Sequence, residues 1–414
     1  MKVLVAGAGI GGLAAALQLH AAGIEVELVE QAPAIREMGV GINLLPHAVR
    51  ELAALGLLDD LDATGIRTEE LIYANRFGQT IWREPRGLAA GHDLPQISIH
   101  RGQLQGLLAR AVIERLGADR LSLGRRLVAF EQTPDGVIVH AVDPQGRPLP
   151  PLRGDVLVGA DGIHSAVRAR LYPEEGPPRW NGHMLWRGCV EEAPFLTGRS
   201  MIVAGDLREK VVLYPISREA HDRGRSLTNW AVWVKLGDGS VPPPRREDWS
   251  RPGSIADVLP HLAHWRFAGF DVPGLLRRTA ACWEFPMCDR EPLARWSFGR
   301  VTLLGDAAHP MYPVGSNGAA QAIIDGRVLA SALKAHADPE AALQAYEAER
   351  LPVTTRIVLN NRQMGPERVI DMAAARAPDG FARIEDVIPL AELEAIAAQY
   401  RQVAGFQRPA AGQA

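Results

Sequence analysis

Cysteine is rare in this sequence, with only Cys189, Cys282 and Cys288 among 414 residues. The number is odd and the three thiols are not clustered, which excludes a disulfide framework of the kind found in small secreted domains. Cys282 and Cys288 are also too far apart for the Cys-x-x-Cys spacing of thiol redox sites. The scarcity of cysteine fits a reducing cytosol.

An excess of charge of either sign is missing too. Lysine and arginine together number 45, aspartate and glutamate number 48, and the formal net charge is −3. This balance gives no positive field for a phosphate backbone or for anionic lipids. We therefore expect neither a nucleic-acid partner nor a membrane partner.

Long apolar runs are absent as well, since no stretch of about 18 uninterrupted apolar residues occurs. The apolar run near the start is broken by glycines at positions 7, 9, 11 and 12, and it continues into the charged, strand-like "EVELVE" without a cleavage site. These glycines argue against a signal peptide. We expect a cytoplasmic protein that is a monomer or a homodimer.

What the sequence does have is size, with 414 residues of which 47% are hydrophobic. A single core usually stops growing below this length, so two packed domains are expected. A chain of this size can bury a large cofactor.

The stretch "KVLVAGAGIGGLAAALQLHAAGIEVELVE" predicts a strand, a tight turn, a helix and a second strand. Gly7 permits the turn, Gly9 lets a pyrophosphate approach the backbone, and Gly12 allows the helix to pack closely on the sheet. Glu30 ends the second strand about 20 residues later, where an acid accepts hydrogen bonds from an adenosine ribose. A Gly-rich turn alone is weak evidence, but this complete context indicates a dinucleotide site, for either FAD or NAD.

Two later stretches bear on the choice of cofactor. "DVLVGADGIHSAVRARL" predicts a strand that turns at Asp161 into a helix, and Asp161 could equally be a simple capping residue. "GRVTLLGDAAHPMYPVGSNGAAQAIIDG" places Asp306 at the carboxyl end of a buried strand, where ligands of open α/β sheets bind. A buried carboxylate is costly unless it accepts hydrogen bonds, and a ribityl chain offers hydroxyls. NAD has no such polyol, so FAD is the expected cofactor.

With these motifs the sequence resembles the group A, single-component flavoprotein aromatic monooxygenases, the class of p-hydroxybenzoate and salicylate hydroxylases. Within that class it is most similar to the phenazine-modifying branch, typified by 5-methylphenazine-1-carboxylate 1-monooxygenase. The resemblance spans roughly residues 1 to 365 and includes all three fingerprints of the family. It is carried by "GAGIGGLAAALQL", "MGVGINLLPHAVRELAALGL", "SIHRGQLQGLL", "LVGADGIHSAVR", "MLWRG" and "LLGDAAHPMYPVGSNGAAQAIIDG".

The resemblance implies how FAD would be bound. Arg101 would reach the pyrophosphate and ribityl region, with Gln105 one turn along the same helix face. Asp161 belongs to a motif associated with both the FAD pyrophosphate and NAD(P)H, and Asp306 would bind the ribityl hydroxyls. The implied cofactor-binding residues are Gly7, Gly9, Gly12, Glu30, Gly41, Ile42, Arg101, Gln105, Asp161, Asp306, Gly318 and Ala319.

The resemblance also implies residues around the flavin ring. Gly41 and Ile42 fall in a loop near one side of the ring, and Gly318 and Ala319 lie in the segment that lines the isoalloxazine. Ala320 is a departure, because some relatives have asparagine there and only backbone N–H groups remain in this chain. The resemblance implies that Pro313 and Gly315 also line the isoalloxazine. The expected substrate pocket consists of Trp186, Tyr214, Pro313 and Gly315.

The predicted fold is α/β, a Rossmann-like FAD-binding domain with an inserted β-sheet substrate domain, as in p-hydroxybenzoate hydroxylase, followed by C-terminal helices. Residues 1–72, 98–178 and 282–365 carry the nucleotide motifs and would form the discontinuous FAD-binding domain. Residues 73–97 and 179–281 would form the substrate domain, from the hairpin "LIYANRFGQTIWREP" and the strand-like runs "HMLWRGCV", "KVVLYPIS" and "LTNWAVWVKL". Residues 366–414 would form a helical tail with a frayed end, and "GDGSVPPPRREDWSRPG" a surface loop.

Several side chains of the substrate domain have two interpretations. Strand alternation places Trp186 and Arg187 on opposite faces, and only one face can line a pocket. Arg187 could pair with an aromatic carboxylate or have a structural role, and Tyr214 could bind substrate or simply pack. His309 is expected to stabilise its turn rather than act as a base.

The resemblance implies that NADH or NADPH reduces FAD and that dioxygen forms a flavin C(4a)-hydroperoxide. This species would hydroxylate a phenazine, quinoline or salicylate-like acid, with or without loss of carbon dioxide. No second Gly-x-Gly-x-x-Gly follows residue 12, so the nicotinamide nucleotide would dock transiently at the shared cleft. No catalytic acid or base is assigned and no metal is expected. A reductase or dehydrogenase of the same fold, or a flavin-binding module without turnover, are the open alternatives.

Overall fold

The computed structural model describes residues 1–37, 39–267 and 270–405. The stretch of residues 406–414, which was expected to fray, lies outside this part of the chain. Within the described residues the strands form sheets of five, three, seven and three strands. Of the helices described there, none is both long enough and apolar enough to cross a membrane.

A five-stranded parallel sheet is built from the apolar runs that precede the nucleotide motifs. Its central strands are buried along nearly their whole length, as expected when other layers cover both faces. Because all neighbours pair in parallel, the glycine motif and Asp306 follow strands that end at the same edge. In spatial order the strands are β18 (Val301–Leu303), β12 (Val156–Gly159), β1 (Lys2–Ala6), β2 (Glu25–Val29) and β8 (Leu121–Ser122).

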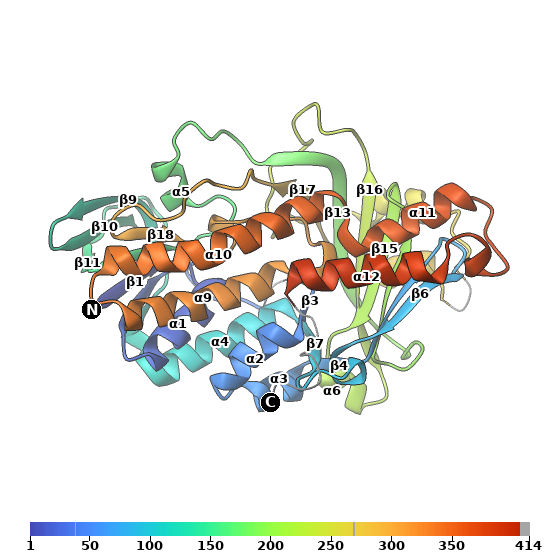
Figure 1. The fold of residues 1–414 in the computed structure, drawn as a ribbon, viewed down its shortest axis with the longest axis horizontal. Helices are drawn as coiled ribbons and strands as arrows, with labels where there is room; N and C mark the ends of the chain where they lie inside the picture. The colour runs from blue at the N-terminus through green and yellow to red at the C-terminus, as the bar shows by residue number, and fades with distance from the viewer. Residues whose placement is uncertain (38, 268–269, 406–414) are drawn as a thin grey trace.

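A layer of helices packs against this sheet, and its members lie side by side in Figure 1. The first and ninth helices approach closely because small residues face each other, so that a Cβ at Gly326 would lie 2.8 Å from the Cα of Ala15. The layer contains α1 (Ile10–Ala21), α4 (Arg101–Leu116), α9 (Gly318–Ala335) and α10 (Pro339–Arg362), with the shorter α2 (Pro46–Ala54) and α3 (Leu58–Thr64).

An antiparallel meander packs on the same sheet and contacts β1 and β12. Its strands are β9 (Arg126–Thr133), β10 (Gly136–Val142) and β11 (Leu152–Gly154). The short helix α5 (Ala166–Leu171) contacts both β12 and β9. These elements complete the end of the molecule that is farthest from the large sheet in Figure 1.

A seven-stranded sheet stands beside the helical layer in Figure 1. The predicted hairpin forms β5 and β6, and the three strand-like runs form β13, β15 and β16. All neighbours are antiparallel except β14 and β5, which pair in parallel. In spatial order the strands are β17 (Cys282–Asp289), β13 (Arg179–Glu192), β16 (Ser226–Lys235), β15 (Glu209–Pro215), β14 (Ser200–Gly205), β5 (Glu70–Ala74) and β6 (Thr80–Pro85).

One face of the seven-stranded sheet packs under α7 (Ile255–Leu262) and α8 (Val272–Arg278). Met184, Trp186 and Trp230 are buried in the core on this face. Met184 and Trp186 are two residues apart on β13, as expected for side chains on the same face of a strand.

The opposite face carries Leu185 and Trp233 and meets Tyr312 and Val314, which follow β18 in the chain. Farther along, α11 (Arg368–Arg376) and α12 (Leu390–Ala404) cover the same face, and in Figure 1 they cross in front of its strands. This is therefore the face that is turned toward the nucleotide motifs.

A small three-stranded sheet links the two large ones. It has the order β3 (Gly41–Leu44), β7 (Gln96–His100) and β4 (Ile66–Thr68), and all its pairs are antiparallel. The remaining helical turns are α6 (Arg218–Asp222) and the 3-10 helices η1 (Gly87–Ala90), η2 (Ala118–Arg120), η3 (Gly305–Ala307), η4 (Val314–Ser316), η5 (Gly365–Glu367) and η6 (Ile384–Asp386).

Two strands of the seven-stranded sheet cross the predicted domain boundaries. β5 begins at Glu70, before the expected start of the substrate domain at residue 73. β17 was assigned to the FAD-binding domain, but it is the edge strand of the seven-stranded sheet and pairs with β13. An apolar run identifies a buried strand, but it does not identify the sheet that the strand joins, because hydrogen-bond partners far away in sequence decide that.

Candidate flavin and substrate site

The turn after β1 has the shape of a phosphate-binding loop. Gly7 has a φ of +107°, a left-handed conformation that favours glycine. A Cβ at Gly12 would lie 2.0 Å from the carbonyl oxygen of Gly7, so only glycine lets α1 start this close to the strand. A Cβ at Gly9 would meet no atom of the described residues within 4 Å. Gly9 therefore borders open space at the N-terminus of α1, where a phosphate can approach.

Glu30 and Gln105 brace this loop from two sides. The carboxylate of Glu30 accepts hydrogen bonds from the backbone N–H groups of Ala8 and Ala32, both at 2.8 Å. The amide nitrogen of Gln105 donates to the carbonyl oxygen of Ala8 at 2.8 Å. Each carboxylate oxygen of Glu30 keeps a lone pair, so it can still accept a ribose hydroxyl.

Asp161 lies beside the phosphate loop and caps a helix. Its carboxylate accepts hydrogen bonds from the Ser165 hydroxyl and from the backbone N–H of Ala166, the latter at 2.7 Å. Burial raises the pKa of this carboxyl, and the hydrogen bond from Ser165 opposes that rise. The turn touches the loop, because a Cβ at Gly7 would lie 2.4 Å from the carbonyl oxygen of Ala160. A direct contact of Asp161 with FAD or NAD(P)H stays a prediction.

Asp306 and Arg101 come from distant parts of the chain and face one recess. Asp306 lies in η3 after β18, and Arg101 begins α4 directly after β7. The Asp306 side chain is exposed to solvent, yet burial raises the pKa of its carboxyl, while the charges of His309 and Arg101 lower it. A side chain that is accessible and also surrounded by protein must line a recess. Burial lowers the pKa of Arg101, and the charge of Asp306 opposes this.

His309 stabilises the turn that carries Asp306. Its Nε2 lies 2.6 Å from the carboxylate of Asp325, which also accepts the backbone N–H of Gly305 at 3.1 Å and the Nε–H of Arg350 at 2.7 Å. Burial alone would raise the pKa of the Asp325 carboxyl, but His309 and Arg350 together lower it to about 2. These contacts are those of a structural network, in line with the role expected for His309.

Arg168 supports the same turn from the other side. Its guanidinium is almost fully buried and donates to the carbonyl oxygens of Ala307 and Ala308, both at 3.0 Å. Its charge is balanced by Glu175. The backbone around Asp306 is therefore held from two directions, which presents the carboxylate at a fixed place.

The loop between η3 and α9 turns sharply and leaves one side open. Gly315 has a φ of +65° and Ser316 a φ of +60°. Pro313 is exposed, and Gly318 and Ala319 are half-buried. The N-cap residue of the 18-residue helix α9 makes no side-chain cap, so the first backbone N–H groups of the helix remain available. Such a helix N-terminus can stabilise negative charge on a bound ring.

Tyr400, on α12, holds this loop in place. Its hydroxyl donates to the carbonyl oxygen of Val314 at 3.1 Å and accepts from the side-chain amide of Asn317 at 2.6 Å. A Cβ at Gly315 would lie only 1.9 Å from the Tyr400 hydroxyl. Its ring packs against Leu45, the residue that follows β3. One tyrosine therefore connects both segments that were expected to flank the flavin ring.

The expected flavin loop at Gly41 lies directly on the seven-stranded sheet. The backbone N–H of Gly41 donates to the side-chain oxygen of Asn229 at 2.7 Å. A Cβ at Gly41 would lie 2.5 Å from the ring of Tyr214. The structure thus brings Gly41 and its half-buried neighbour Ile42 to the predicted substrate residue Tyr214.

Arg187 and Trp249 lie at the same place. The guanidinium carbon of Arg187 is 4.2 Å from the centre of the Trp249 ring, and that of Arg101 is 5.8 Å from it. Trp249 also stacks on Phe285 with ring centres 4.0 Å apart. Burial, together with the charge of Arg101, lowers the pKa of Arg187 to about 9, and Tyr214 opposes this. Arg101 therefore connects Asp306 with Trp249 and Arg187 on the face of the large sheet that carries Leu185.

Trp186 is not part of this group. Its side chain belongs to the core on the other face of β13, where its ring lies near His261 with centres 6.4 Å apart. Alternation along the strand separates Trp186 from Arg187, and the packing places Arg187 on the side of Tyr214. We therefore do not carry Trp186 into the proposed substrate pocket.

Trp249 and Tyr400 were not singled out from the sequence. Trp249 is the one large aromatic residue in the Pro-rich, charged segment that was expected to be only a surface loop, which is a signal that a loop makes a specific contact. Tyr400 ends an apolar stripe on α12 that includes Leu393, Ile396 and Ala397. That stripe predicts a buried tyrosine, but it gives no indication of what the tyrosine contacts.

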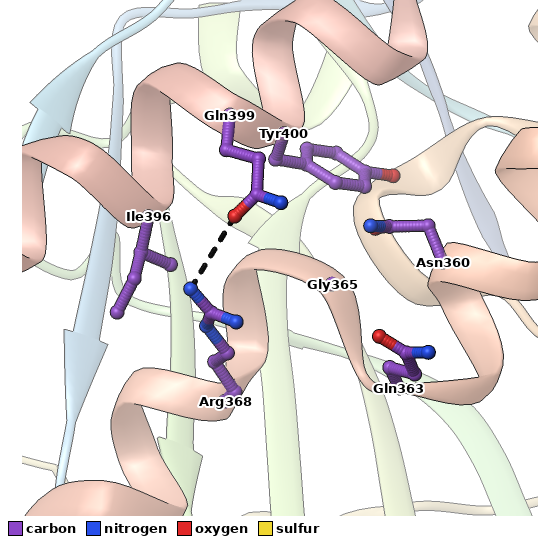
Figure 2. Close-up of a pocket in the computed structure, with 7 residues that line it drawn as sticks. All are labelled: Asn360, Gln363, Gly365, Arg368, Ile396, Gln399 and Tyr400. Atoms are coloured by element: carbon purple, nitrogen blue, oxygen red, sulfur yellow. Dashed lines mark hydrogen bonds between the residues drawn. The ribbon is translucent and has the colours of Figure 1, made fainter.

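A small cavity of about 20 Å³ lies beside Tyr400 and is shown in Figure 2. A volume of this size holds one water molecule and cannot hold an aromatic ring. Among the residues that the structure describes, no group of three or more His, Cys, Asp or Glu side chains could hold a metal ion. The cavity is lined by Asn360, Gln363, Gly365, Arg368, Ile396, Gln399 and Tyr400.

Comparison with known families gives one match that covers more than half of the chain. The family described as "FAD binding domain" matches residues 1–194 and 285–361. The matched segments contain the phosphate loop, Arg101, Asp161 and Asp306. The residues present fit the cofactor, because Gly9 leaves room for a phosphate and the carboxylate of Asp306 faces an open recess.

Similar proteins extend the match over nearly the whole chain. A protein of Lysobacter antibioticus named phenazine 1,6-dicarboxylic acid hydroxylase PhzS is 48% identical over 97% of this chain and 96% of its own length. A 3-hydroxybenzoate 6-hydroxylase of Polaromonas naphthalenivorans is 32% identical over 92% and 94%. The structure of Klebsiella pneumoniae HpxO with FAD and uric acid is 26% identical and has a TM-score of 0.72, over 98% of this chain and 93% of that one.

Proposed function

The chain belongs to the FAD-binding family of aromatic hydroxylases, and from this premise we propose that it uses NADH or NADPH and dioxygen to hydroxylate an N-heteroaromatic acid. The chain is an FAD-dependent aromatic monooxygenase. The 48% identity to a hydroxylase named for phenazine-1,6-dicarboxylic acid supports a phenazine-like substrate. Quinoline acids are smaller N-heteroaromatic acids, and salicylate-like acids are aromatic acids without a ring nitrogen.

One observation carries the proposal, namely that three segments expected to bind the cofactor meet one face of the seven-stranded sheet. These are the loop at Gly41, the start of α4 at Arg101 and the loop at Val314. Asp306 and Arg101 share a recess, and Arg101 lies near the ring of Trp249. The guanidinium of Arg187 lies against the ring of Trp249, and Tyr214 is close enough to Arg187 to affect its pKa. A cofactor held at the recess would therefore have its reactive end near the side chains of the seven-stranded sheet.

FAD, when bound, supplies the transfer of electrons from the nicotinamide and the activation of dioxygen. The chain supplies the binding contacts. Gly9 and the N-terminus of α1 would hold the diphosphate, Glu30 the ribose, and Asp306 with Arg101 the sugar chain. The open N-terminus of α9 would stabilise negative charge on the ring.

Tyr214 is suited to donate a hydrogen bond to the substrate. Burial raises the pKa of its hydroxyl, and the nearby charge of Arg187 opposes this only partly. The hydroxyl therefore stays protonated at neutral pH. A donor of this kind can orient an oxygen or nitrogen atom of an aromatic ring without carrying a charge of its own.

Trp249 would help to exclude water from the reacting ring. It projects from a segment without helix or strand, yet it stacks on the buried Phe285. Exclusion of water matters here because the activated oxygen is otherwise lost as hydrogen peroxide. A flat aromatic side chain at the border of the recess is suited to that task.

The test is oxygen uptake by the FAD-loaded protein with NADH or NADPH and a panel of phenazine, quinoline and salicylate acids. The proposal requires uptake that the acid stimulates, and one atom of labelled dioxygen in the product. The mass of the product also shows whether carbon dioxide is lost. Stimulated oxidation of the nicotinamide without label in the product would indicate a reductase. Binding without any oxidation would indicate a module without turnover.

A further inference from the structure

Arg187 is a buried cation with very little to bind. Its side chain is 7% exposed, and its Nε has no hydrogen-bond partner among the described residues. The hydrogen bond that it makes, from a terminal nitrogen to the carbonyl oxygen of Trp249, is long at 3.3 Å. A guanidinium offers five N–H donors, so most of its capacity is unused.

No carboxylate in the described part of the chain forms an ion pair with Arg187. The charged side chain that lowers its pKa is Arg101, which has the same sign, and both guanidiniums approach the ring of Trp249. The contact with an aromatic ring compensates only a small part of what is lost when a charge leaves water. A buried arginine of this kind requires an anion that the chain itself does not provide.

The surroundings of Arg187 indicate which anion this is. The contacts that brace the phosphate loop come from Glu30, Gln105 and the Ala160 turn, and none of them involves β13. Arg187 instead lies near Tyr214 and Trp249, which belong to the sheet side of the recess. Its anion is therefore carried by the molecule that binds against the sheet.

We propose that Arg187 is the anion-binding residue of the substrate site and that it takes a carboxylate attached to an aromatic ring. The planar fork of an arginine matches the two oxygens of a carboxylate, and a flat ring system can lie against the neighbouring indole of Trp249. This inference rests on the proposed function only in taking the sheet side of the recess as the substrate site.

The test compares an acid with its uncharged amide. FAD-loaded wild type and Arg187→Gln are titrated by calorimetry with phenazine-1-carboxylate and with phenazine-1-carboxamide, without NADH or NADPH. We expect wild type to bind the acid about 10- to 100-fold more tightly than the amide. Arg187→Gln should lose most of this preference by weakening the acid alone, and Arg187→Lys, which keeps the charge without the fork, should be intermediate.

Arg208→Gln is the matched control, because Arg208 is an exposed arginine on the turn between β14 and β15. It should keep the preference for the acid. FAD content and thermal melting are measured for every variant. If Arg187→Gln does not fold, the ratio of acid affinity to amide affinity in Arg187→Lys decides.

Four results would overturn the inference. These are an unchanged preference in a folded Arg187 variant, equal binding of acid and amide by wild type, no binding of either by wild type, and loss of FAD from the variant, which would assign Arg187 to the cofactor. The outcome is separate from that of the proposed function, because binding is measured without turnover. A protein that prefers the acid but never incorporates oxygen would keep this inference and lose the other.

Discussion

The hydroxyl of Tyr400 donates a hydrogen bond to the carbonyl oxygen of Val314 over 3.1 Å. Val314 belongs to the loop that leads from Asp306 to α9, and Tyr400 belongs to α12, a helix outside the segments matched by the FAD-binding family. The contact makes the shape of the flavin loop depend on a distant helix. It also explains why Gly315 must be glycine, since any Cβ there would strike the tyrosine.

Tyr400→Phe should weaken FAD binding while leaving the fold intact. The change removes one hydroxyl and its hydrogen bonds to Val314 and Asn317, which corresponds to about 1 kcal/mol, or roughly a fivefold loss of affinity. The measurement is the FAD dissociation constant from flavin fluorescence. Tyr172→Phe is the control, because the Tyr172 hydroxyl also donates to a backbone carbonyl oxygen, that of Arg295, far from this loop in sequence. Both variants should melt earlier, but only Tyr400→Phe should release FAD more readily, and equal FAD affinities in the two variants would contradict the role of Tyr400.

Gly9→Ala should abolish tight FAD binding without destabilising the apoprotein. Gly9 has an ordinary φ of −72°, and a Cβ there meets nothing within 4 Å in the part of the chain that the structure describes, so the fold accepts the methyl group. The methyl group would occupy the space that a phosphate needs. Melting of the apoprotein and FAD titration measure the two effects separately. Gly106→Ala, a change within α4 with only ordinary contacts, should bind FAD like wild type. Unchanged FAD affinity in Gly9→Ala would show that the diphosphate binds elsewhere.

Asp306→Ala should lower FAD affinity by about 1 to 3 kcal/mol, because charge-assisted hydrogen bonds to the cofactor are lost. The apoprotein should become no less stable, since burial raises the pKa of this carboxyl and its ionised form is unfavourable in the fold. Fluorescence titration and thermal melting at neutral pH test both statements. The FAD affinity of Asp306→Asn, which keeps one acceptor oxygen, should lie between those of wild type and Asp306→Ala. Wild-type affinity in Asp306→Ala would remove Asp306 from the cofactor site.

Asp325→Asn should change the acid stability of the protein. The folded pKa of Asp325 is lowered to about 2 from 3.8, so its ionised form adds stability that is fully present above about pH 4. This contribution is lost as the pH falls from about 4 toward 2, when the carboxyl becomes protonated. The variant should melt earlier than wild type at pH 7, and the difference should shrink over that acid range. A difference that does not depend on pH would mean that Asp325 acts through packing and not through charge.

The course of the chain in the FAD-binding part could be predicted because its signals are local. Glycine spacing, a buried strand and a terminal acid all lie within about 30 residues of each other in a single strand-helix-strand unit. The apolar runs of the large sheet were equally visible, and the structure confirms β13, β15 and β16. The membership of β17 was wrong because pairing depends on residues about a hundred positions away, and nothing in a short run encodes that.

The site itself was only partly predictable. Alternation separated Trp186 from Arg187, but it did not indicate which face of β13 would meet the cofactor segments. That choice is made by long-range packing, in which Tyr312 and Val314 lie against Leu185. Trp249 was missed for a different reason, since a lone aromatic residue in a segment without periodic apolar residues indicates a specific contact but does not indicate with which part of the chain.

The attachment of the flavin loop to Tyr400 has a consequence for biosynthesis. A ribosome completes the glycine turn near the start of the chain long before it reaches α12. A nascent or prematurely terminated polypeptide would form the dinucleotide fold and yet bind the flavin only weakly. Tight flavin binding would then require that α12 has been synthesised and that the side chain of Tyr400 has packed against the loop.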